Sequence, residues 1–485
     1  MSYRRLVTIV TLLAIFTMAL RVSVANDSWW HLRAGEWILD NGRPLRVDLF
    51  SLTRQGQPWI YPGWLAEIAM GLLFRWLGYG GLNLLTALAV LVAFAFLWRI
   101  VQAPPLVKGF SFVLAAAVSG VYWSARPHIL SFAMTGAFLW ALARFRQDGL
   151  KAIWLPPALM ALWVNLHGGF VIGLLLLAVE LASLLLERFG PARLQTPPEG
   201  GTGRNLRDLL GASLLSLLVV SLNPNGPVML LYPWKTVSIG VLRDYIQEWQ
   251  SPDFHSLQVQ PFLWMLFLTF ALMAISPRRP TWRQLLTVGL FGYMGFLAAR
   301  NVALFGLMAL PPLADHAGAT LEPWIPGPYG GRQLTGRAAA ALNAVLLGLV
   351  VLAALLKARI PLSLAANEAA VRDQQPVQAV EYIATYQPPG PLFNSYNWGS
   401  YVIWRLYPEY LSFVDGRTDL FDDEILEQYL TLWRADEGWE QLVQRWDLRL
   451  ALLEPQAPLS AALRQVGWAS LYQDDQSIIL AAPSE

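Results

Sequence analysis

The sequence contains no cysteine and little charge. Of its 485 residues none is Cys, and only 14% are Asp, Glu, Lys or Arg. The missing thiol excludes disulfide bonds, iron–sulfur clusters, thiolate zinc sites and cysteine nucleophiles. The formal net charge of +2 argues against a nucleic-acid-binding protein. The sequence also has no phosphate-binding loop, no nucleophile elbow and no internal repeat.

Apolar residues make up most of what is present. They account for 55% of the chain, which includes 22 Trp, so most of its length cannot face water. About eleven segments are apolar enough to cross a membrane. They are residues 6–25, 81–98, 109–123, 129–143, 153–164, 170–186, 209–222, 261–275, 285–299, 302–314 and 338–356. We expect the first to be an uncleaved span, and residues 64–77, which Glu67 and Arg75 interrupt, to form an amphipathic helix at the interface. The expected fold is a polytopic α-helical membrane protein.

Lys and Arg gather in alternate connecting segments, which sets the predicted orientation. The short turns of the other side contain only Arg126 and Arg300. This asymmetry predicts a cytoplasmic N-terminus and places residues 26–80, 223–260 and everything after Lys357 outside. We therefore expect a transmembrane domain over residues 1–358, with two long outer loops, and an extracytoplasmic domain over residues 359–485. The cations assigned to the cytoplasmic side are Arg4, Arg5, Arg99, Lys108, Arg144, Arg146, Lys151, Arg188, Arg193, Arg204, Arg207, Arg278, Arg279, Arg283, Arg332 and Arg337.

The outward turns of this topology collect unusual polar side chains. Ionisable residues at the edge of a membrane bundle are costly unless they have partners, so their gathering on one side predicts a functional site. These residues could also have purely structural roles. Asp27 could cap a helix, and His128 and His167 could each form hydrogen bonds at a helix end. Arg21 could extend to the membrane interface, and the tryptophans could form an interfacial belt. The polar residues are Asn26, Asp27, His31, Arg126, His128, Asn165, His167, Asn223, Asn225, Arg300 and Asn301, and the tryptophans are Trp29, Trp30, Trp64 and Trp123.

The C-terminal part changes to alternating helices and strands. We expect helices over residues 375–386, 422–434 and 439–446, and strands over 390–393, 410–415, 448–453, 470–472 and 477–481, which together predict a small α/β domain. Ligands often bind where strands of such sheets end. Asn394, Trp398, Asp415 and Arg417 could therefore hold an acceptor, or they could attach this domain to the bundle.

Several of these segments resemble the GT-C superfamily of integral-membrane glycosyltransferases. The resemblance lies in a first helix, an outer loop that opens with an acidic residue, a helical bundle and a C-terminal extracytoplasmic domain. In particular, Asp27-Ser-Trp-Trp-His31-Leu-Arg-Ala-Gly35, Gly42-Arg-Pro44, Asp48-Leu-Phe-Ser51, Trp59, Trp64-Leu65, Phe393-Asn394-Ser-Tyr396-Asn-Trp398-Gly399-Ser-Tyr401 and Phe413-Val-Asp415-Gly416-Arg417 are similar to an uncharacterised bacterial branch. Where that branch often has an acid before Trp64, this sequence has Gly63.

The resemblance implies a polyprenyl-phosphate-linked sugar donor and inverting transfer to an extracytoplasmic glycan, lipid or protein. Such transfer needs a carboxylate to take the acceptor proton, and Asp27 is the expected general base. A departing lipid phosphate needs cations and hydrogen-bond donors near the headgroup level. Arg126 and Arg300 are the expected phosphate ligands. His128, Asn165, His167, Asn301, Arg21 and His31 are the further candidates for binding the donor.

Other readings stay open at this point. Asp27, His31, His128 and His167 could furnish a site for a divalent metal, although no tight spacing supports one and no cofactor is firmly expected. A lipid-linked glycan ligase or polymerase is an alternative function, and so is a non-catalytic membrane assembly or binding protein. The expected location is the cytoplasmic (inner) membrane of a bacterium.

Overall fold

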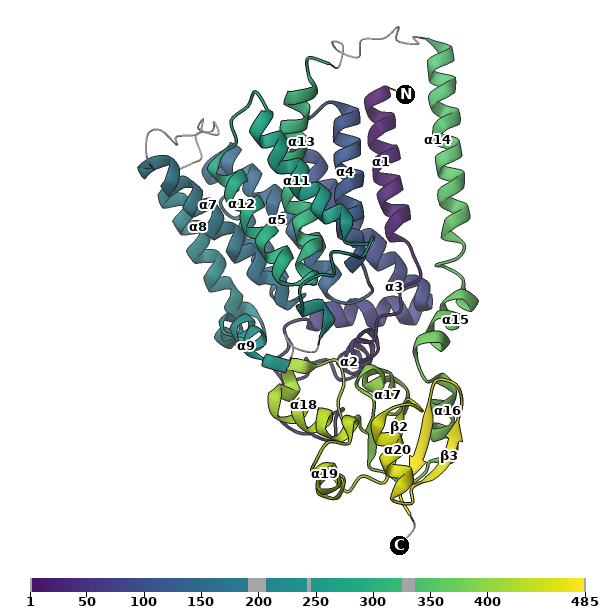
Figure 1. Ribbon diagram of the computed structural model, residues 1–485. Coiled ribbons are helices and arrows are strands. Elements are labelled where there is room, and N and C mark those ends of the chain that lie inside the picture. Colours follow the sequence, from purple (N-terminus) through teal and green to yellow (C-terminus); the bar gives the residue numbers. More distant parts are fainter. Residues whose placement is uncertain (1, 191–205, 242–245, 325–335, 484–485) are drawn as a thin grey trace. The chain divides into compact units, whose positions relative to one another are not determined.

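The computed structural model of the chain describes residues 2–190, 206–241, 246–324 and 336–483 (Figure 1). Arg193, Arg204 and Arg332, three of the cations assigned to the cytoplasmic side, lie outside these residues, as does part of the predicted loop 223–260. The described chain is mainly α-helical and has one four-stranded sheet.

The chain forms two compact units. Unit 1 comprises residues 1–21, 83–230 and 246–361, and unit 2 comprises residues 22–82, 231–245 and 362–485. The sequence predicted a division at 358/359 with both outer loops in the transmembrane domain. In the structure, the first loop and part of the second pack with the C-terminal residues. Aromatic side chains of the first loop share one apolar core with them, and Val241 of the second loop packs against this core.

Unit 1 is a helical bundle built around α13 (Val302–Leu321). This helix packs against α4 (Pro105–Ser119), α11 (Gln260–Ile275) and α12 (Trp282–Leu297), and most of its residues are buried (Figure 1). The remaining helices of the unit are α1 (Tyr3–Ala19), the later part of α3 (Trp64–Ile100), α5 (His128–Asp148), α6 (Leu155–Trp163), α7 (Val171–Phe189), α8 (Leu206–Leu218) and α14 (Arg337–Ala358). Short 3-10 helices lie in the connections, among them η7 (Gln247–Trp249) and η8 (Ala299–Asn301).

Among the described residues, six helices are long and apolar enough to cross a membrane. They span residues 64–100, 105–122, 128–152, 168–189, 299–321 and 338–358. Every one of the predicted apolar segments contains a helix, but α1, α6, α8, α11 and α12 are shorter, at 9 to 17 residues. The protein is thus a helical membrane protein with six candidate spans, and the count of about eleven stays a prediction.

Two predicted helix ends differ in their outcome. The predicted interfacial segment 64–77 ends at Gly78, whose φ of +57° and ψ of −145° are not helical, so α3 consists of two helical parts that meet at a kink. Pro311 and Pro312 lie inside α13, which runs on to Leu321. A proline in a helix removes one backbone hydrogen bond, and the dense packing around α13 compensates for that loss.

Unit 2 contains a small sheet with helices around it. Its strands are β1 (Leu392–Asn394), β2 (Leu450–Leu453), β3 (Ala469–Gln473) and β4 (Ile478–Ala481), in the order β1-β2-β4-β3, with β1 parallel to β2 and the other pairs antiparallel. Its helices are α2 (Ser28–Asn41), the first part of α3, α9 (Tyr232–Ser238), α15 (Leu364–Gln374), α16 (Val377–Tyr386), α17 (Gly399–Leu406), α18 (Thr418–Arg434), α19 (Trp439–Arg445) and α20 (Pro458–Gln465).

The predicted strand over residues 410–415 is wrong. This segment forms only an isolated bridge, in which Ser412 pairs with Ser51 of the first loop. Leu52 N–H donates to the Ser412 carbonyl at 2.7 Å, and Ser412 N–H donates to the Phe50 carbonyl at 3.0 Å. The backbone N–H and C=O groups of Ser412 are therefore satisfied by a loop that is remote in sequence rather than by the sheet.

Candidate functional site

Asp27 lies at the start of α2 in unit 2, but it does not cap this helix. It occupies the N-cap position with helical φ and ψ, and its side chain makes no cap hydrogen bond. The carboxylate instead faces the turn Asp415-Gly416-Arg417, where a Cβ at position 416 would overlap Asp27 Oδ1. Two motifs that lie far apart in the sequence thus meet, and only glycine at position 416 leaves room for the half-exposed carboxylate.

His31 follows Asp27 by one helical turn and is buried with Glu67. His31 Nδ1 lies 3.3 Å from Glu67 Oε1, and the two residues are 4% and 2% exposed. Gly35, one further turn along α2, allows the two helices to touch, because a Cβ there would overlap the Glu67 carbonyl oxygen. The packing of α2 against α3 therefore fixes the imidazole and the carboxylate beside the Asp27 end of α2.

Three acidic side chains, Asp27, Glu67 and Asp419, lie close enough to Tyr61 to act on it. Burial raises the pKa of Tyr61, and the nearby charges of Glu67, Asp419 and Asp27 raise it further. Burial also raises the pKa of Asp419 to about 6, against the opposing effects of a hydrogen bond from Tyr232 at 3.1 Å and of the Lys235 and Arg417 charges. Asp27 thus shares this part of unit 2 with a buried tyrosine and two further acidic side chains.

Arg417 is a fully buried cation that holds the first loop to the C-terminal part of unit 2. It donates to both carboxylate oxygens of Asp415 at 2.7 Å and to Asp48 Oδ1 at 2.5 Å. Burial lowers its pKa, but the adjacent Asp415 and Asp48 charges outweigh burial and raise it. Its guanidinium also lies 5.0 Å from the centre of the Trp59 ring. These contacts fix the turn against which Asp27 rests.

The residues expected to bind an acceptor are buried within unit 2. Asn394 and Asp415 are fully buried, and Trp398 and Arg417 are 4% and 1% exposed. Asn394 donates to the Val414 carbonyl at 2.9 Å and accepts from Phe413 N–H at 2.7 Å. Their observed contacts serve the packing of unit 2, and contact with an acceptor stays a prediction.

Trp29, Trp30 and Trp123 do not form an exposed belt. They are 2–4% exposed. In unit 2, Trp29 lies edge-on to Tyr401 at 5.1 Å, and Trp30 packs against Trp59 at 5.5 Å. Trp29 and Trp30 are part of the aromatic packing that positions α2, whereas Trp123 is buried within unit 1 next to Phe132. Of the four tryptophans, only Trp64 is partly exposed, as a residue of an interfacial belt would be.

A second polar cluster forms within unit 1, at the turns predicted to face outward. It consists of Arg126, His128, His167, Glu248 and Arg300, which we call the Arg126 cluster. Arg126 donates to Glu248 Oε2 at 2.9 Å. Arg300 lies over the Trp249 ring, 4.3 Å from its centre. Four residues that the sequence placed in three separate outward turns therefore share one electrostatic environment.

The charges of this cluster set the protonation of its members. Burial acts to raise the pKa of Glu248, but the Arg126 and Arg300 charges and the Arg126 hydrogen bond outweigh it and hold the pKa at about 2. Burial lowers the pKa of His167, and the charges of His128, Arg300 and Arg126 lower it further. At neutral pH the cluster has two guanidinium groups, one carboxylate and a neutral His167, so it is cationic and able to bind an anion.

The other residues proposed in unit 1 have structural partners. His128 Nε2 lies 2.8 Å from the Tyr122 carbonyl, and His167 Nδ1 lies 2.9 Å from Ser131 Oγ. Asn223 donates to Asn165 Oδ1 at 3.3 Å, which joins two of the predicted turns. Arg21 and Asn301 donate to backbone carbonyl oxygens. Arg21 donates to the Trp123 carbonyl at 2.5 Å, and Asn301 donates to the Met294 carbonyl at 3.0 Å.

Sequence reasoning missed Glu248, Trp249 and Ser131, and it named Glu67 only for interrupting the predicted interfacial helix. Glu248 and Trp249 form η7, in a loop without a motif, and reach their partners only through the fold. Their one available signal was a carboxylate and an aromatic ring in a long predicted outer loop. Over the described residues, no group of three or more His, Cys, Asp or Glu side chains could hold a metal ion. The four proposed metal ligands divide between the units, with Asp27 and His31 in unit 2 and His128 and His167 in unit 1.

These features define a polytopic helical membrane protein with one acidic and one cationic polar cluster. No protein-family model and no curated protein matches its sequence. Solved structures do match its fold. Archaeal oligosaccharyltransferase AglB from Archaeoglobus fulgidus, in complex with an inhibitory peptide and a dolichol-phosphate, aligns over 98% of this chain and 74% of its own at 13% identity and a TM-score of 0.58.

Two further structures cover the whole chain or nearly so. ArnT from Cupriavidus metallidurans bound to undecaprenyl phosphate aligns over 99% of both chains at 13% identity and a TM-score of 0.54. Arabinofuranosyltransferase AftD from Mycobacteria aligns over 100% of this chain and 40% of its own at 14% identity and a TM-score of 0.53. The chain has the fold of the GT-C membrane glycosyltransferases, as its sequence motifs predicted.

Proposed function

We propose that the protein transfers a sugar from a polyprenyl-phosphate-linked donor to an acceptor on the outer face of the membrane, with inversion and with Asp27 as general base. The observation that carries this proposal is the position of Asp27: it opens the first loop, leaves α2 uncapped and rests half-exposed against the turn 415–417. The AglB and ArnT structures contain dolichol-phosphate and undecaprenyl phosphate, which supports a lipid phosphate as the carrier.

In this mechanism the acceptor attacks the anomeric carbon of the donor sugar. Its hydroxyl oxygen forms the new glycosidic bond, its proton passes to Asp27, and the bond between the anomeric carbon and the phosphate oxygen breaks with its electrons on the departing lipid phosphate. Gly416 keeps space beside the Asp27 carboxylate. The reaction class needs no redox partner.

The Arg126 cluster has the charge that the departing phosphate requires. Two guanidinium groups with few other anions nearby stabilise negative charge most strongly when they are partly buried. Arg126 is already hydrogen-bonded to Glu248, so a phosphate would have to compete with this carboxylate for Arg126. We assign Arg126 and Arg300 to the phosphate, and His128, His167, Asn165, Asn301, Arg21 and His31 to the remaining donor contacts or to supporting them.

Gly416→Ala tests whether the position of Asp27 matters. The added methyl would overlap Asp27 Oδ1 and so push the carboxylate aside, and the backbone at 416 does not have the positive φ that would strain alanine. We expect transfer of radiolabelled sugar by the purified protein in nanodiscs to fall roughly 10²-fold, as for other misplaced catalytic groups. Gly211→Ala is the matched control, because a Cβ there meets nothing within 4 Å. Full activity of both variants would remove Asp27 from the reaction.

Opposite charge changes in the Arg126 cluster should have opposite effects on donor affinity. Arg126→Ala or Arg300→Ala is expected to weaken binding of polyprenyl-phosphate sugar by about 2 kcal/mol or more, through the loss of a charge-assisted contact. Glu248→Gln removes the competing carboxylate and should strengthen binding. Equilibrium binding of labelled donor to the purified protein measures both. Unchanged affinity in all three variants would place the phosphate site elsewhere.

The remaining expectations belong to the same proposal. They are a bacterial inner-membrane location with a cytoplasmic N-terminus, about eleven spans and an extracytoplasmic C-terminal domain. Transfer of a whole lipid-linked glycan is the variant that the likeness to an oligosaccharyltransferase favours. A divalent metal stays a candidate cofactor, which chelator treatment in the transfer assay tests directly.

A further inference from the structure

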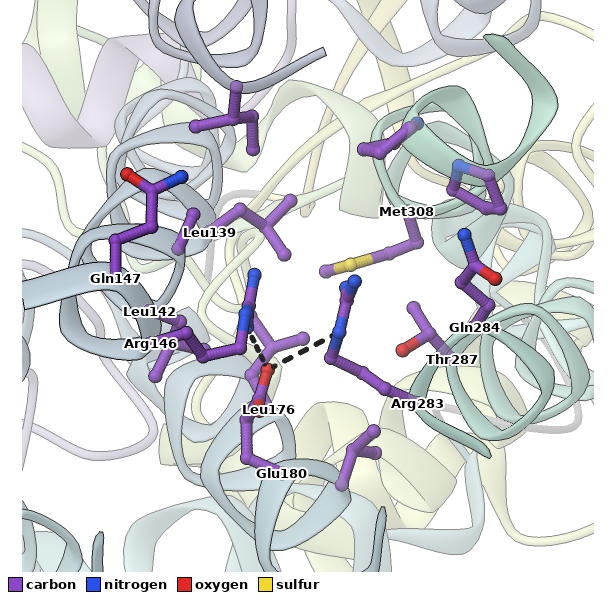
Figure 2. A pocket seen from close by; sticks show the side chains of 15 residues that line it. Leu139, Leu142, Arg146, Gln147, Leu176, Glu180, Arg283, Gln284, Thr287 and Met308 are labelled. Atoms are coloured by element: carbon purple, nitrogen blue, oxygen red, sulfur yellow. Dashed lines mark hydrogen bonds and ion pairs between the residues drawn. The ribbon is translucent and has the colours of Figure 1, made fainter. Parts of the chain in front are cut away.

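The bundle of unit 1 turns its charged side chains inward and large apolar ones outward. Figure 2 shows a cavity of about 250 Å³ between α5, α7, α12 and α13, in which Arg146 and Arg283 are both directed at Glu180. These three side chains are 16%, 19% and 8% exposed, respectively. The outside of the bundle has apolar residues such as Trp264 and Phe267, which are 66% and 62% exposed. This distribution is the one expected of helices whose solvent is lipid.

Helix α9 of unit 2 has the same distribution. Leu231, directly before the helix, and Trp234 and Val237 within it are 68%, 80% and 69% exposed. Residues spaced three apart lie on one side of a helix, so these three form a continuous apolar surface that we call the α9 strip. A helix on the surface of a water-soluble domain would turn such a strip toward the core.

Polar contacts hold the other side of this segment on α18. The Tyr232 hydroxyl donates to Asp419 Oδ2 at 3.1 Å. Further along, the backbone N–H groups of Gly240 and Val241 donate to the two carboxylate oxygens of Asp423 at 3.2 and 2.9 Å. The outward orientation of the α9 strip is therefore fixed by hydrogen bonds within unit 2.

The chain reaches α9 from an apolar surface of the bundle. The preceding elements are α8, η5 and the 3-10 helix η6 (Gly226–Leu230). Along them Leu218, Leu222 and Leu230 are 59%, 66% and 39% exposed. Exposed apolar side chains on the helices of a membrane protein face lipid. Since Leu231 follows Leu230 directly, the α9 strip continues this surface along the chain.

The length and composition of α9 suit a position at the membrane interface. Seven residues make about 10 Å of helix, which is too short to cross a membrane but can lie along its surface. Tryptophan is enriched at the headgroup level. Lys235, beside the strip, pairs with Asp422 at 3.6 Å. The strip itself offers apolar area without the directional polar groups of a typical protein–protein interface, which favours lipid over a partner protein.

We propose that the α9 strip inserts into the headgroup region of the lipid bilayer and is a membrane contact of unit 2, while the contacts with α18 keep α9 attached to this unit. The contact lies on the part of unit 2 that contains Asp27, because the charges of Tyr232, Asp419 and Asp27 all act on Tyr61. The proposal is independent of the glycosyltransferase function, since it rests on the exposure and packing of α9.

The lack of cysteine in the chain permits a direct test, because a single introduced cysteine can be labelled alone. Val237→Cys, Val345→Cys and Val466→Cys replace valines that are 69%, 57% and 48% exposed, and each receives a nitroxide spin label. Val345 lies in α14, a candidate span, and is the lipid reference. Val466 follows α20 in unit 2 and is the water reference.

The measurement is made on the purified full chain in lipid nanodiscs. Power saturation of the electron paramagnetic resonance signal gives the accessibility of each label to oxygen, which concentrates in lipid, and to a water-soluble nickel chelate. We expect the Val237 label to resemble the Val345 label, with high oxygen and low nickel accessibility, at a depth of roughly 5–10 Å. Trp234→Asp in the Val237→Cys background should shift the label toward the nickel accessibility found at Val466.

Three results would overturn the proposal. One is a Val237 label as accessible to nickel as the Val466 label, which would place the α9 strip in water. Another is shielding of the Val237 label from both reagents, which would show that protein, such as a second copy of the chain, covers the strip. The third is an unchanged label in Trp234→Asp. Should Trp234→Asp fail to fold, the comparison of the three labelled valines still decides.

Discussion

Asp27→Asn is expected to reduce sugar transfer by roughly 10²- to 10⁴-fold, the usual contribution of a general base. Asn has the shape of Asp but does not take up a proton at neutral pH. The substitution breaks no helix cap, because the Asp27 side chain makes none. Transfer of radiolabelled sugar in nanodiscs measures the effect, and donor affinity should change little because the base acts on the acceptor.

Asp40→Asn is the control for this experiment. Asp40 is a carboxylate of the same helix, but it is 65% exposed and pairs with Arg75 at 2.9 Å. We expect it to retain wild-type transfer. Loss of activity in both variants would indicate that α2 as a whole is disturbed. If Asp27→Asn retained wild-type activity, Asp27 would not be the general base.

Arg417→Met should destabilise unit 2 by about 3–5 kcal/mol, the largest stability effect we expect. Methionine fills much of the space, but it leaves Asp48 and Asp415 buried without the cation that both contact. Thermal unfolding followed by near-ultraviolet circular dichroism reports on this change, since unit 2 contains a dense group of tryptophans and tyrosines. Arg449→Met, at a cation that is 46% exposed, is the control and should change stability little.

The pH dependence of this defect has a predictable sign. Burial acts to raise the pKa of Asp48, but the Arg417 charge and several hydrogen bonds hold the pKa below its usual value. In the wild type, Asp48 therefore contributes stability above the ordinary Asp pKa of about 4, and this contribution is lost as pH falls through the lower folded value. In Arg417→Met the Asp48 carboxyl loses this cation and takes up a proton more readily. The gap between variant and wild type should narrow as the pH is lowered from 7 to 4, and a constant gap would contradict an electrostatic cause.

Much of the bundle could be predicted from the sequence, because long apolar runs in lipid leave the backbone few alternatives to a helix. Thr281 and Gln284 even form a capping box at the start of α12. Helix ends were harder to predict: the segment 64–77 ends at Gly78 as expected, but α13 continues through Pro311 because of its packing against neighbouring helices. The strand expected at 410–415 failed for a related reason: its backbone partner is the loop around Ser51.

The candidate site was predicted only in part. The sequence singled out Asp27 and Arg417. The predicted order of spans also placed Arg126, His128, His167 and Arg300 on the same side of the membrane. It could not show that Gly416 makes room for Asp27, because that depends on the contact between a loop and a turn far apart in the chain. It also left open whether Arg417 holds an acceptor or attaches the C-terminal domain to the bundle. The described contacts of this residue are with Asp48, Asp415 and aromatic rings.

The most direct test of the central claim is sugar transfer by the wild-type protein. Purified protein in lipid nanodiscs is incubated with radiolabelled polyprenyl-phosphate sugars and candidate acceptors, with and without a chelator, and both the labelled product and the released polyprenyl phosphate are measured. We predict that the two appear in equal amounts, with inverted configuration at the anomeric carbon. Binding of donor without release of polyprenyl phosphate, across a panel of sugars and acceptors, would contradict the glycosyltransferase function and favour a non-catalytic binding protein.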